Sequence, residues 1–335
     1  MTQLLVESPL VVTHHSMDFD LQSRQIFPQP IAKPVAWAEG MRRFSPSAIN
    51  EYMRCQLLFF YNRVAKIKAP QKQVVIIEPN VLGSVFHKTA ELFYLDFVKH
   101  GNPVITPARL APFLEPAADA SLVFYVRRAM AEEQVGENVL VEQIVKSFFK
   151  QLLRNDSKLE TFKIKGLETP RSLTFNVLVN GAVRQVELCG IIDRMDIVSD
   201  STINDGTETL RIVDYKTNGS MEQALSMDAL FTPGEKHPHY VLQTFLYALM
   251  VAPDVNSMPL MPTLFFVNKY GDKTFLPYIK YVNEPLTDFA PLAQDFKFRL
   301  EKLLSEMLDE ATPFKPTSVL QRCENCNYRL LCYGK

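Results

Sequence analysis

The chain has 335 residues, of which 47% are hydrophobic and 11% are aromatic, so it can bury a sizeable core and does not have the composition of a disordered protein. The formal net charge of −1 excludes a protein that binds nucleic acid through a strongly basic overall charge. Any contact with a polyanion must come from a local basic groove. No apolar run approaches the ~20 residues that span a bilayer, and no signal peptide is evident, so we expect a cytoplasmic protein without membrane contact.

The first 43 residues show no sustained periodicity and contain several prolines, which predicts a linker or N-terminal arm over 1–43. Order is expected to begin at Ser45, a plausible N-cap that is followed by a proline at the first helical position. The apolar and aromatic residues after it predict a helix or a broken pair of helices. We therefore expect one structured domain over 44–335.

Helical patterns dominate the next part of the chain. Apolar residues recur at helical spacing from about Val81 to Lys99, which predicts one long helix. Similar patterns continue over 107–154. The sequence therefore predicts an α-helical insertion, over about 101–165, that precedes the sheet.

Strand patterns begin near Arg171, where apolar residues alternate with polar or smaller ones. Asn180-Gly181 is a strong signal for a two-residue hairpin turn. A return strand is expected over about 182–189, followed through Gly190 by a strand over 191–198. After a polar turn, a further strand is expected from Leu210 to Tyr215.

The remaining elements complete an α/β pattern. The sequence predicts a helix from about Pro238 to Val251, a strand from about Pro262 to Asn268, a second strand near Thr274 to Tyr281, and a long helix over about 287–309. Strands and helices in this order predict a central mixed sheet with helical flanks.

Carboxylates and a lysine gather on the two strands in the middle of this pattern. The period of two residues puts Asp214 and Lys216 on the same face of one strand. If this strand pairs with the preceding one as a hairpin, Asp193 comes close to Asp214. Two such carboxylates repel each other unless a cation lies between them, and their hard oxygen ligands suit Mg²⁺ or Mn²⁺. Such an ion can activate water for attack on a phosphodiester, with the lysine ammonium stabilising charge.

Two helical pairs accompany this set. Gly83 and His87 lie four residues apart on one helix face, where the small glycine would permit close approach of another backbone. Gln243 and Tyr247 form a second such pair on an otherwise apolar helix. Taken alone, the histidine is more often an ordinary helix residue, and the glutamine and tyrosine are equally consistent with two satisfied polar tips on a buried helix.

Four motifs together resemble those of RecB-family exonucleases of the PD-(D/E)xK superfamily. They are Gly83-Ser84-Val85-Phe86-His87 for GxxxH, Gly190-Ile191-Ile192-Asp193-Arg194 for GxxDR, Val213-Asp214-Tyr215-Lys216-Thr217 for DYK[ST], and Gln243-x-x-x-Tyr247 for QxxxY. The resemblance covers about 44–335 and implies a restriction-endonuclease-like core. One departure is that Ile192 replaces the proline of the superfamily name.

The resemblance also implies roles for individual residues. It implies that the metal is ligated by His87, Asp193, Asp214 and the Tyr215 carbonyl. It implies that Lys216 is catalytic together with the two aspartates. Gln243 and Tyr247 are expected to support catalysis or contact DNA. Arg194 and Lys269, which lie near the expected cleft, are candidate phosphate contacts, as are Lys66, Lys68 and Lys72, although surface lysines and arginines are more often simply solvated.

Five cysteines are too few for a secreted disulfide scaffold, and their close spacing near the C-terminus is more typical of metal or cluster binding. Cys323, Cys326 and Cys332, with Cys55 as the fourth ligand, could hold zinc or an iron-sulfur cluster, and spacing alone does not choose between them. The pattern resembles the iron-sulfur staple of AddB-type nucleases, which implies a [4Fe-4S] cluster that ties the domain ends together. Cys189 is interpreted as a small buried strand residue.

These features predict a Mg²⁺- or Mn²⁺-dependent deoxyribonuclease, an exonuclease of DNA repair or recombination. The chain has no G-x-x-x-x-G-K-[ST] motif for a motor of its own, so the resemblance implies a helicase or ATPase partner. Two alternatives remain: a catalytically silent DNA-binding scaffold module of a helicase-nuclease complex, and an interaction protein organised by zinc.

Overall fold

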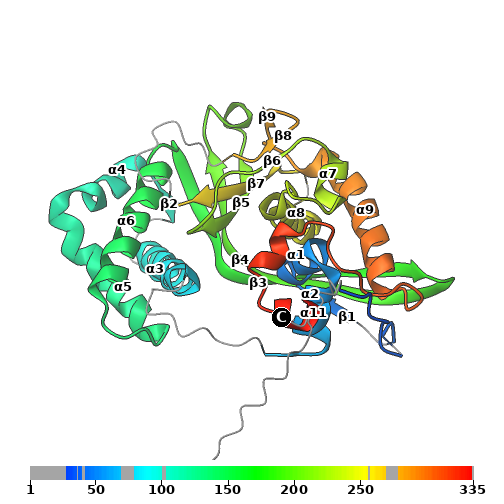
Figure 1. Ribbon diagram of the computed structural model, residues 1–335. Helices are drawn as coiled ribbons and strands as arrows, with labels where there is room; N and C mark the ends of the chain where they lie inside the picture. Colours follow the sequence, from blue (N-terminus) through cyan, green and yellow to red (C-terminus); the bar gives the residue numbers. More distant parts are fainter. Residues whose placement is uncertain are drawn as a thin grey trace, which may run out of the picture.

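A curled mixed sheet carries helices on both of its faces, as Figure 1 shows. The computed structural model describes residues 28–35, 37–39, 42–68, 79–99, 103–255, 257–268 and 278–333. Within these ranges no helix combines the length and the apolar character needed to cross a membrane. The arrangement confirms the expected α/β class with a central mixed sheet.

Six strands form the main sheet, in the order β2-β3-β4-β5-β7 with β1 beside β4. The β1–β4 and β5–β7 pairs are parallel, and the others are antiparallel. The strands span Arg42–Phe44 (β1), Val104–Ile105 (β2), Thr161–Val179 (β3), Ala182–Ser199 (β4), Thr209–Lys216 (β5) and Leu260–Phe266 (β7). A small second sheet contains Gln223–Ala224 (β6), Lys280–Tyr281 (β8) and Glu284–Pro285 (β9).

The long hairpin β3–β4 is the backbone of the sheet. Its turn is the predicted Asn180-Gly181, whose φ angles of 50° and 81° are both in the left-handed region that this turn requires. Both strands are longer than expected, because β4 continues without interruption through Gly190 and β3 pairs with it along nearly its whole length. The helical insertion therefore ends earlier than predicted, since the segment from Thr161 onward is strand.

Helices cover the two faces and create two cores. On one face lie α1 (Pro46–Arg54), α2 (Gln56–Phe59), α7 (Met227–Phe231), α8 (His239–Val251) and α9 (Ala290–Leu308). On the other lie α3 (Pro79–Lys99), α4 (Pro107–Leu110), α5 (Asp119–Glu132) and α6 (Val139–Asp156). Strand β5, which is buried up to its last residue, serves both cores, because Ile212 packs into the first and Val213 into the second.

Short helical turns complete the described chain. They are the π-helix Phe60–Val64 (η1), the 3-10 turns Ala111–Leu114 (η2), Pro116–Ala118 (η3), Asn204–Gly206 (η4) and Ala252–Asp254 (η5), and the C-terminal helices Gln321–Glu324 (α10) and Arg329–Tyr333 (α11). The predicted helices and strands after residue 200 agree with the structure to within a few residues. Of the strand expected near Thr274 to Tyr281, the part before residue 278 lies outside the described residues.

The segment before α1 is not a separate arm where the structure describes it. Ile31 pairs with Phe314, and the Trp37 indole donates to the carbonyl of Met307. The ammonium of Lys33, buried to 7% exposure, donates to the carbonyls of Glu306 at 2.6 Å and Asp309 at 2.8 Å. The expectation of a linker or N-terminal arm is therefore wrong for these described positions, since they pack on the C-terminal end of α9. Residues 1–27 lie outside the description.

Candidate active site

The site forms at a break in the pairing of β4. Along one edge of β4, β1 pairs with Val186–Leu188 and β5 pairs with Arg194–Val198. The stretch from Cys189 to Asp193 lies between these two partners. At its end the backbone N–H of Tyr215 donates to the Asp193 carboxylate at 2.7 Å. At this break, a hydrogen bond to the Asp193 side chain takes the place of a backbone hydrogen bond between the strands. Asp193 therefore lies where β4 and β5 separate.

Three side chains form a compact group of potential metal ligands there. His87 Nδ1 lies 3.4 Å from Asp193 Oδ1 and 3.6 Å from Glu168 Oε1. One ligand atom of each of the three residues lies within 4.8 Å of the others, and no other such group occurs among the described residues. One imidazole nitrogen and two carboxylates are a suitable donor set for a divalent cation such as Mn²⁺ or Mg²⁺.

Sequence reasoning missed Glu168. Leu167 pairs with Arg194 and Thr169 pairs with Ile192, so Glu168 lies opposite Asp193 on the neighbouring strand. No motif marks it, and the start of β3 was expected only at Arg171. The correct strand start would have allowed the register of the hairpin to be counted back from the Asn180-Gly181 turn to this glutamate.

Asp214 and Lys216 form the second half of the site. Lys216 Nζ lies 2.6 Å from Asp214 Oδ2, and both side chains are largely buried. Because Arg194 pairs with Val213, Asp214 lies opposite Asp193 at the open end of the strand pair. Asp214 is not a member of the compact group, since its carboxylate is held by the Lys216 ammonium and by the Gln243 amide at 3.3 Å.

The charges of these groups are strongly coupled. Burial opposes the charged form of His87, but Asp193 and Glu168 raise its pKa to about 10. Burial raises the pKa of Asp214 to about 6, with Lys216 opposing and Asp193 adding to this shift. Despite burial, His87, Lys216 and the Tyr215 amide keep the pKa of Asp193 below its ordinary value. The positive charges of His87 and Lys216 therefore stabilise the charged carboxylates, and a bound metal ion would take over this stabilisation.

Helix α8 supplies the predicted polar pair. Gln243 Nε2 donates to the Tyr247 hydroxyl at 3.2 Å and to Asp214, so both residues adjoin the site. Tyr247 packs against Gly190, where an added Cβ would lie 2.9 Å from the tyrosine Cε1. The glycine of one motif and the tyrosine of another therefore fit together directly.

Gly83 has a different role from the one expected. A Cβ at this position would meet only the Thr217 hydroxyl, at an ordinary contact distance of 3.6 Å. No backbone atom of the described part of the chain comes close enough to require a glycine. The residue instead lines the hollow that opens beside His87 and Glu168.

Tyr215 lies beneath the ligand group with its ring in the second core. Its ring meets the rings of Phe86 at 5.4 Å and His87 at 5.7 Å, both edge-on. These contacts fix α3 against β5 and so set the position of the His87 imidazole. The role of the Tyr215 carbonyl as a ligand stays a prediction.

Arg194 does not reach the surface, so its expected contact with DNA is wrong. Its side chain is fully buried on the α3 and α6 side of the sheet, where two of its nitrogens lie 2.7 Å and 2.8 Å from the Asp156 carboxylate. Its Nε lies 2.9 Å from Asp196. The strand alternation is interrupted next to Asp193, because Ile192 and Arg194 face opposite cores despite their even spacing. Lys66 and Lys68 are exposed, Lys72 and Lys269 lie outside the described residues, and a phosphate contact by these lysines stays a prediction.

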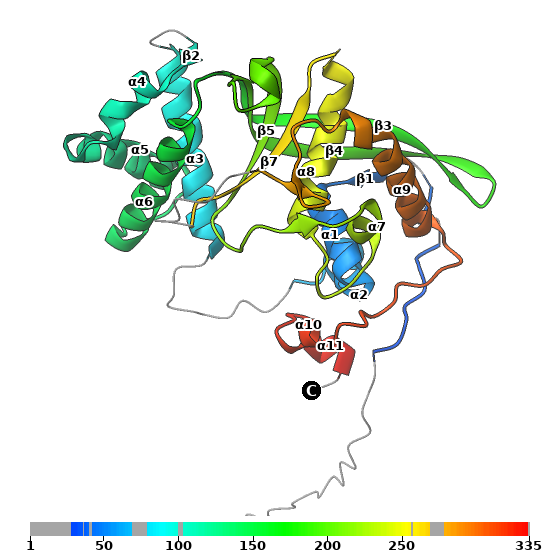
Figure 2. The same ribbon diagram turned by 90° about the horizontal axis from the view of Figure 1, so that it is seen from above.

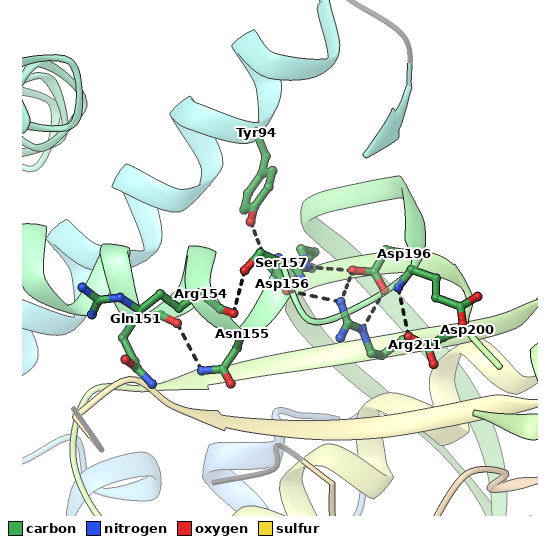
Figure 3. Close-up of polar contacts among 11 residues, drawn as sticks. Tyr94, Gln151, Arg154, Asn155, Asp156, Ser157, Asp196, Asp200 and Arg211 are labelled. Atoms are coloured by element: carbon green, nitrogen blue, oxygen red, sulfur yellow. Dashed lines mark hydrogen bonds and ion pairs between the residues drawn. The ribbon is translucent and has the colours of Figure 1, made fainter. Parts of the chain in front are cut away.

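A buried ionic network surrounds this arginine, and Figure 3 shows Tyr94, Asp156, Asp196 and Arg211 gathered between α3, α6 and the sheet. Arg211 binds Asp196 through two nitrogens at 2.7 Å and 2.8 Å, and the Tyr94 hydroxyl donates to Asp156. Two arginines balance two aspartates. The network therefore joins the strands that carry Asp193 and Asp214 to the helix that carries His87.

The four candidate cluster cysteines come from both ends of the domain and meet beside α1. Cys55 caps the end of α1, and the C-terminal segment packs there through Arg322, which donates to the carbonyl of Arg54 at 3.1 Å. Burial, opposed by a hydrogen bond with Tyr61, and the charges of the other three thiols raise the pKa of Cys332 to about 11. Yet no three of the sulfur atoms of these described residues lie within 4.8 Å of one another. Cys189 lies on β4, as expected, but it is half-buried and not fully buried.

The family model of the PD-(D/E)XK nuclease superfamily matches residues 43–333. The chain belongs to this nuclease superfamily. Its curled mixed sheet with flanking helices is consistent with a restriction-endonuclease-like core, and members of this superfamily are typically metal-dependent nucleases. The superfamily membership covers every motif residue named above.

Other comparisons add little to the membership in the PD-(D/E)XK superfamily. No curated protein matches the chain. Among solved structures, the crystal structure of SSO0001 is similar over 76% of this chain and 97% of its own, with 15% identity and a TM-score of 0.27. A likeness at this level carries no argument about function.

Proposed function

We propose that this member of the PD-(D/E)XK superfamily is a RecB-like, AddB-type deoxyribonuclease that hydrolyses phosphodiester bonds of DNA as an exonuclease. The observation that carries the proposal is the compact group of His87, Glu168 and Asp193 beside the ion pair of Asp214 and Lys216. A purely structural cluster has no need for three acidic side chains at one partly open position.

The donor set fits Mg²⁺ or Mn²⁺. His87, Glu168 and Asp193 would hold the ion, and Asp214 and the Tyr215 carbonyl would complete its ligands. When bound, the ion lowers the pKa of a coordinated water and neutralises charge on the phosphate. The positive charge that His87 and Lys216 now supply to the carboxylates would then come from the ion, which would free Lys216 from Asp214.

The remaining residues act on the substrate. The Lys216 ammonium orients the attacking water and stabilises the charged phosphorane oxygens as the bond to the leaving oxygen breaks. The Gln243 amide and the Tyr247 hydroxyl keep Asp214 in place from the α8 side. They also lie where a neighbouring nucleotide would pass.

Activity on DNA tests the proposal directly. The purified protein is expected to degrade end-labelled single- or double-stranded DNA with Mg²⁺ or Mn²⁺ and not with EDTA. Lys216→Ala should abolish cleavage without unfolding the protein. Lys146→Ala is a matched control, because Lys146 is also largely buried, with 17% exposure against 16% for Lys216, and it is ion-paired with Asp119.

The same assay decides the main alternative, a catalytically silent DNA-binding scaffold module. Metal-independent DNA binding without cleavage would support the scaffold and overturn the nuclease. Full activity of Lys216→Ala would overturn the assigned site. End-labelling at the 5′ or the 3′ terminus would further separate exonuclease from endonuclease products.

A [4Fe-4S] cluster on Cys55, Cys323, Cys326 and Cys332 is the second part of the proposal. Four thiolates around zinc, at about 2.3 Å each, would lie about 3.8 Å apart. No three sulfur atoms of these described cysteines lie that close together, and the charges of the other three thiols raise the pKa of Cys332, which supports a shared site for the four thiols. Anaerobic purification should yield iron, sulfide and a brown colour, whereas zinc alone would support the zinc-organised interaction protein.

The cellular role and partner rest on the resemblance of the motifs. A helicase or ATPase motor is the expected partner in DNA repair or recombination, because the chain carries no phosphate-binding loop of its own. Stimulation of cleavage by a motor protein that unwinds the DNA end would support this part.

A further inference from the structure

Two hollows of different charge open at the proposed active site. The first, about 480 Å³, lies on the α3 side and is lined by three glutamates, Glu91, Glu133 and Glu168, together with Lys88 and His87. Lys88 is already paired with Glu91 at 2.8 Å and Glu132 at 3.3 Å. A polyanion would therefore be repelled along this side.

The second hollow, about 610 Å³, lies on the α1 and α8 side, and Figure 2 shows α3 well apart from both of these helices. It begins at Gln243 and Tyr247, which adjoin Asp214, and runs past Gly190 and Ile191. Its walls also carry Arg43 and Arg171, together with the hydroxyls of Ser45, Ser47 and Ser172. Among the described residues of its lining, Glu187 alone carries a carboxylate.

The two arginines are available to a ligand. Arg43, 65% exposed, pairs with Glu187 at 2.6 Å, and Arg171, 36% exposed, pairs with Asp254 at 3.5 Å. Exposed pairs of this kind contribute at most about 1 kcal/mol, so an incoming phosphate can exchange with the carboxylates. The Arg171 Nε is a buried donor without a hydrogen-bond partner among the described residues. The described residues supply no partner for this donor, so a bound anion can accept from it.

The start of α1 adds to the same wall. Ser45 caps the helix by accepting from Ala48, and its hydroxyl contacts that of Ser47 at 2.8 Å. The positive end of a nine-residue helix dipole therefore points at the hollow, next to two hydroxyls that can donate to an anion.

Building on the proposed function, we infer that the second hollow is the path of a nucleic-acid strand next to the scissile phosphate. Arg43 and Arg171 bind its backbone phosphates, and Gln243 and Tyr247 meet the nucleotide beside the metal. Recognition through phosphates carries no base information, so binding along this path is independent of sequence.

The experiment measures binding of a fluorescent single-stranded oligonucleotide by anisotropy, in EDTA so that cleavage does not interfere. Arg43→Ala with Arg171→Ala should weaken binding roughly tenfold at low salt and reduce the slope of log K against log[salt] by about 0.7 per arginine. Arg127→Ala matches Arg43, being 70% exposed and 2.6 Å from its partner Glu142. Arg299→Ala matches Arg171, with 29% exposure. Neither control should change the slope.

The outcomes separate this inference from the proposed function. If the double variant has the affinity and salt slope of the two controls, the path is wrong even if the wild-type protein cuts DNA. If the double variant loses binding while the wild-type protein never cuts with metal, the path stands and the nuclease proposal fails. Comparing unfolding midpoints of all variants ensures that lost binding is not lost folding.

Discussion

Tyr247 occupies the space above Gly190 that any larger residue would need, since a Cβ there would come within 2.9 Å of the tyrosine ring. The Tyr247 hydroxyl accepts from the Gln243 amide, which also donates to Asp214. The contact between Gly190 on β4 and Tyr247 on α8 thus sets the position of a polar chain that ends at the Asp214 carboxylate.

Gly190→Ala is expected to displace Tyr247 and lower both stability and cleavage. Overpacking of this kind costs about 1–3 kcal/mol, measured as the free energy of unfolding in urea. Gly83→Ala is the control in the other glycine motif, because its Cβ meets only the Thr217 hydroxyl at 3.6 Å and a helical alanine is more favourable by about 1 kcal/mol. Equal losses in both variants would contradict the interpretation.

Glu168→Gln is expected to weaken Mn²⁺ binding by at least tenfold. Removing a residue that only hydrogen-bonds to a metal ligand already lowers metal affinity by about tenfold or more. The change keeps the size of the side chain and removes one negative charge from the ligand group. Glu133→Gln, in the same hollow but outside the compact group, should bind Mn²⁺ as the wild type does. Calorimetric titration would measure both, and an unchanged dissociation constant for Glu168→Gln would remove it from the ligand set.

Metal binding should release protons. The pKa of His87 is raised to about 10, so the imidazole is protonated at pH 7–9 and must lose its proton to become a ligand. Apparent Mn²⁺ affinity should therefore rise about tenfold per pH unit in this range. Below about pH 6 the slope should approach two protons, because the pKa of Asp214 is about 6. Titrations in buffers of different ionisation enthalpy would count the protons, and His87→Asn should lose one of them.

Arg194→Ala should destabilise the fold by about 3–5 kcal/mol, because it leaves the two buried carboxylates of Asp156 and Asp196 with Arg211 as the remaining cation of the pair of arginines. Tyr94→Phe removes one hydrogen bond to Asp156 and should cost only about 1 kcal/mol. Urea unfolding would measure both. If Arg194→Ala is instead stable and its DNA binding depends less on salt than that of the wild type, Arg194 contacts DNA and its assignment to the buried network is wrong.

The motif residues on α3, β4, β5 and α8 were predictable because their spacing follows local periodicity. Asp214 and Lys216 share a strand face, and Gln243 and Tyr247 share a helix face, whatever the tertiary structure is. The hairpin turn at Asn180-Gly181 was equally local. These features needed no knowledge of what packs against them.

Glu168 and Arg194 show where this reasoning ends. The place of Glu168 depends on the register of a strand that begins ten residues before its alternating pattern does, at Thr161. The burial of Arg194 depends on an irregularity next to Asp193 and on a carboxylate from α6. Both are long-range properties, and a charged residue beside a catalytic one looks the same in sequence whether it faces solvent or a buried partner.

The Lys33 ammonium donates hydrogen bonds to carbonyls at the end of α9. The nearby Trp37 ring packs edge-on against the rings of Phe59 and Phe314, with centroid distances of 6.3 Å and 6.0 Å. A fragment started at residue 44, where the expected domain begins, would uncover this aromatic surface and leave those carbonyls to water. Expression of the catalytic unit therefore has to begin upstream of Ile31. Shorter versions should be recovered mainly as aggregates.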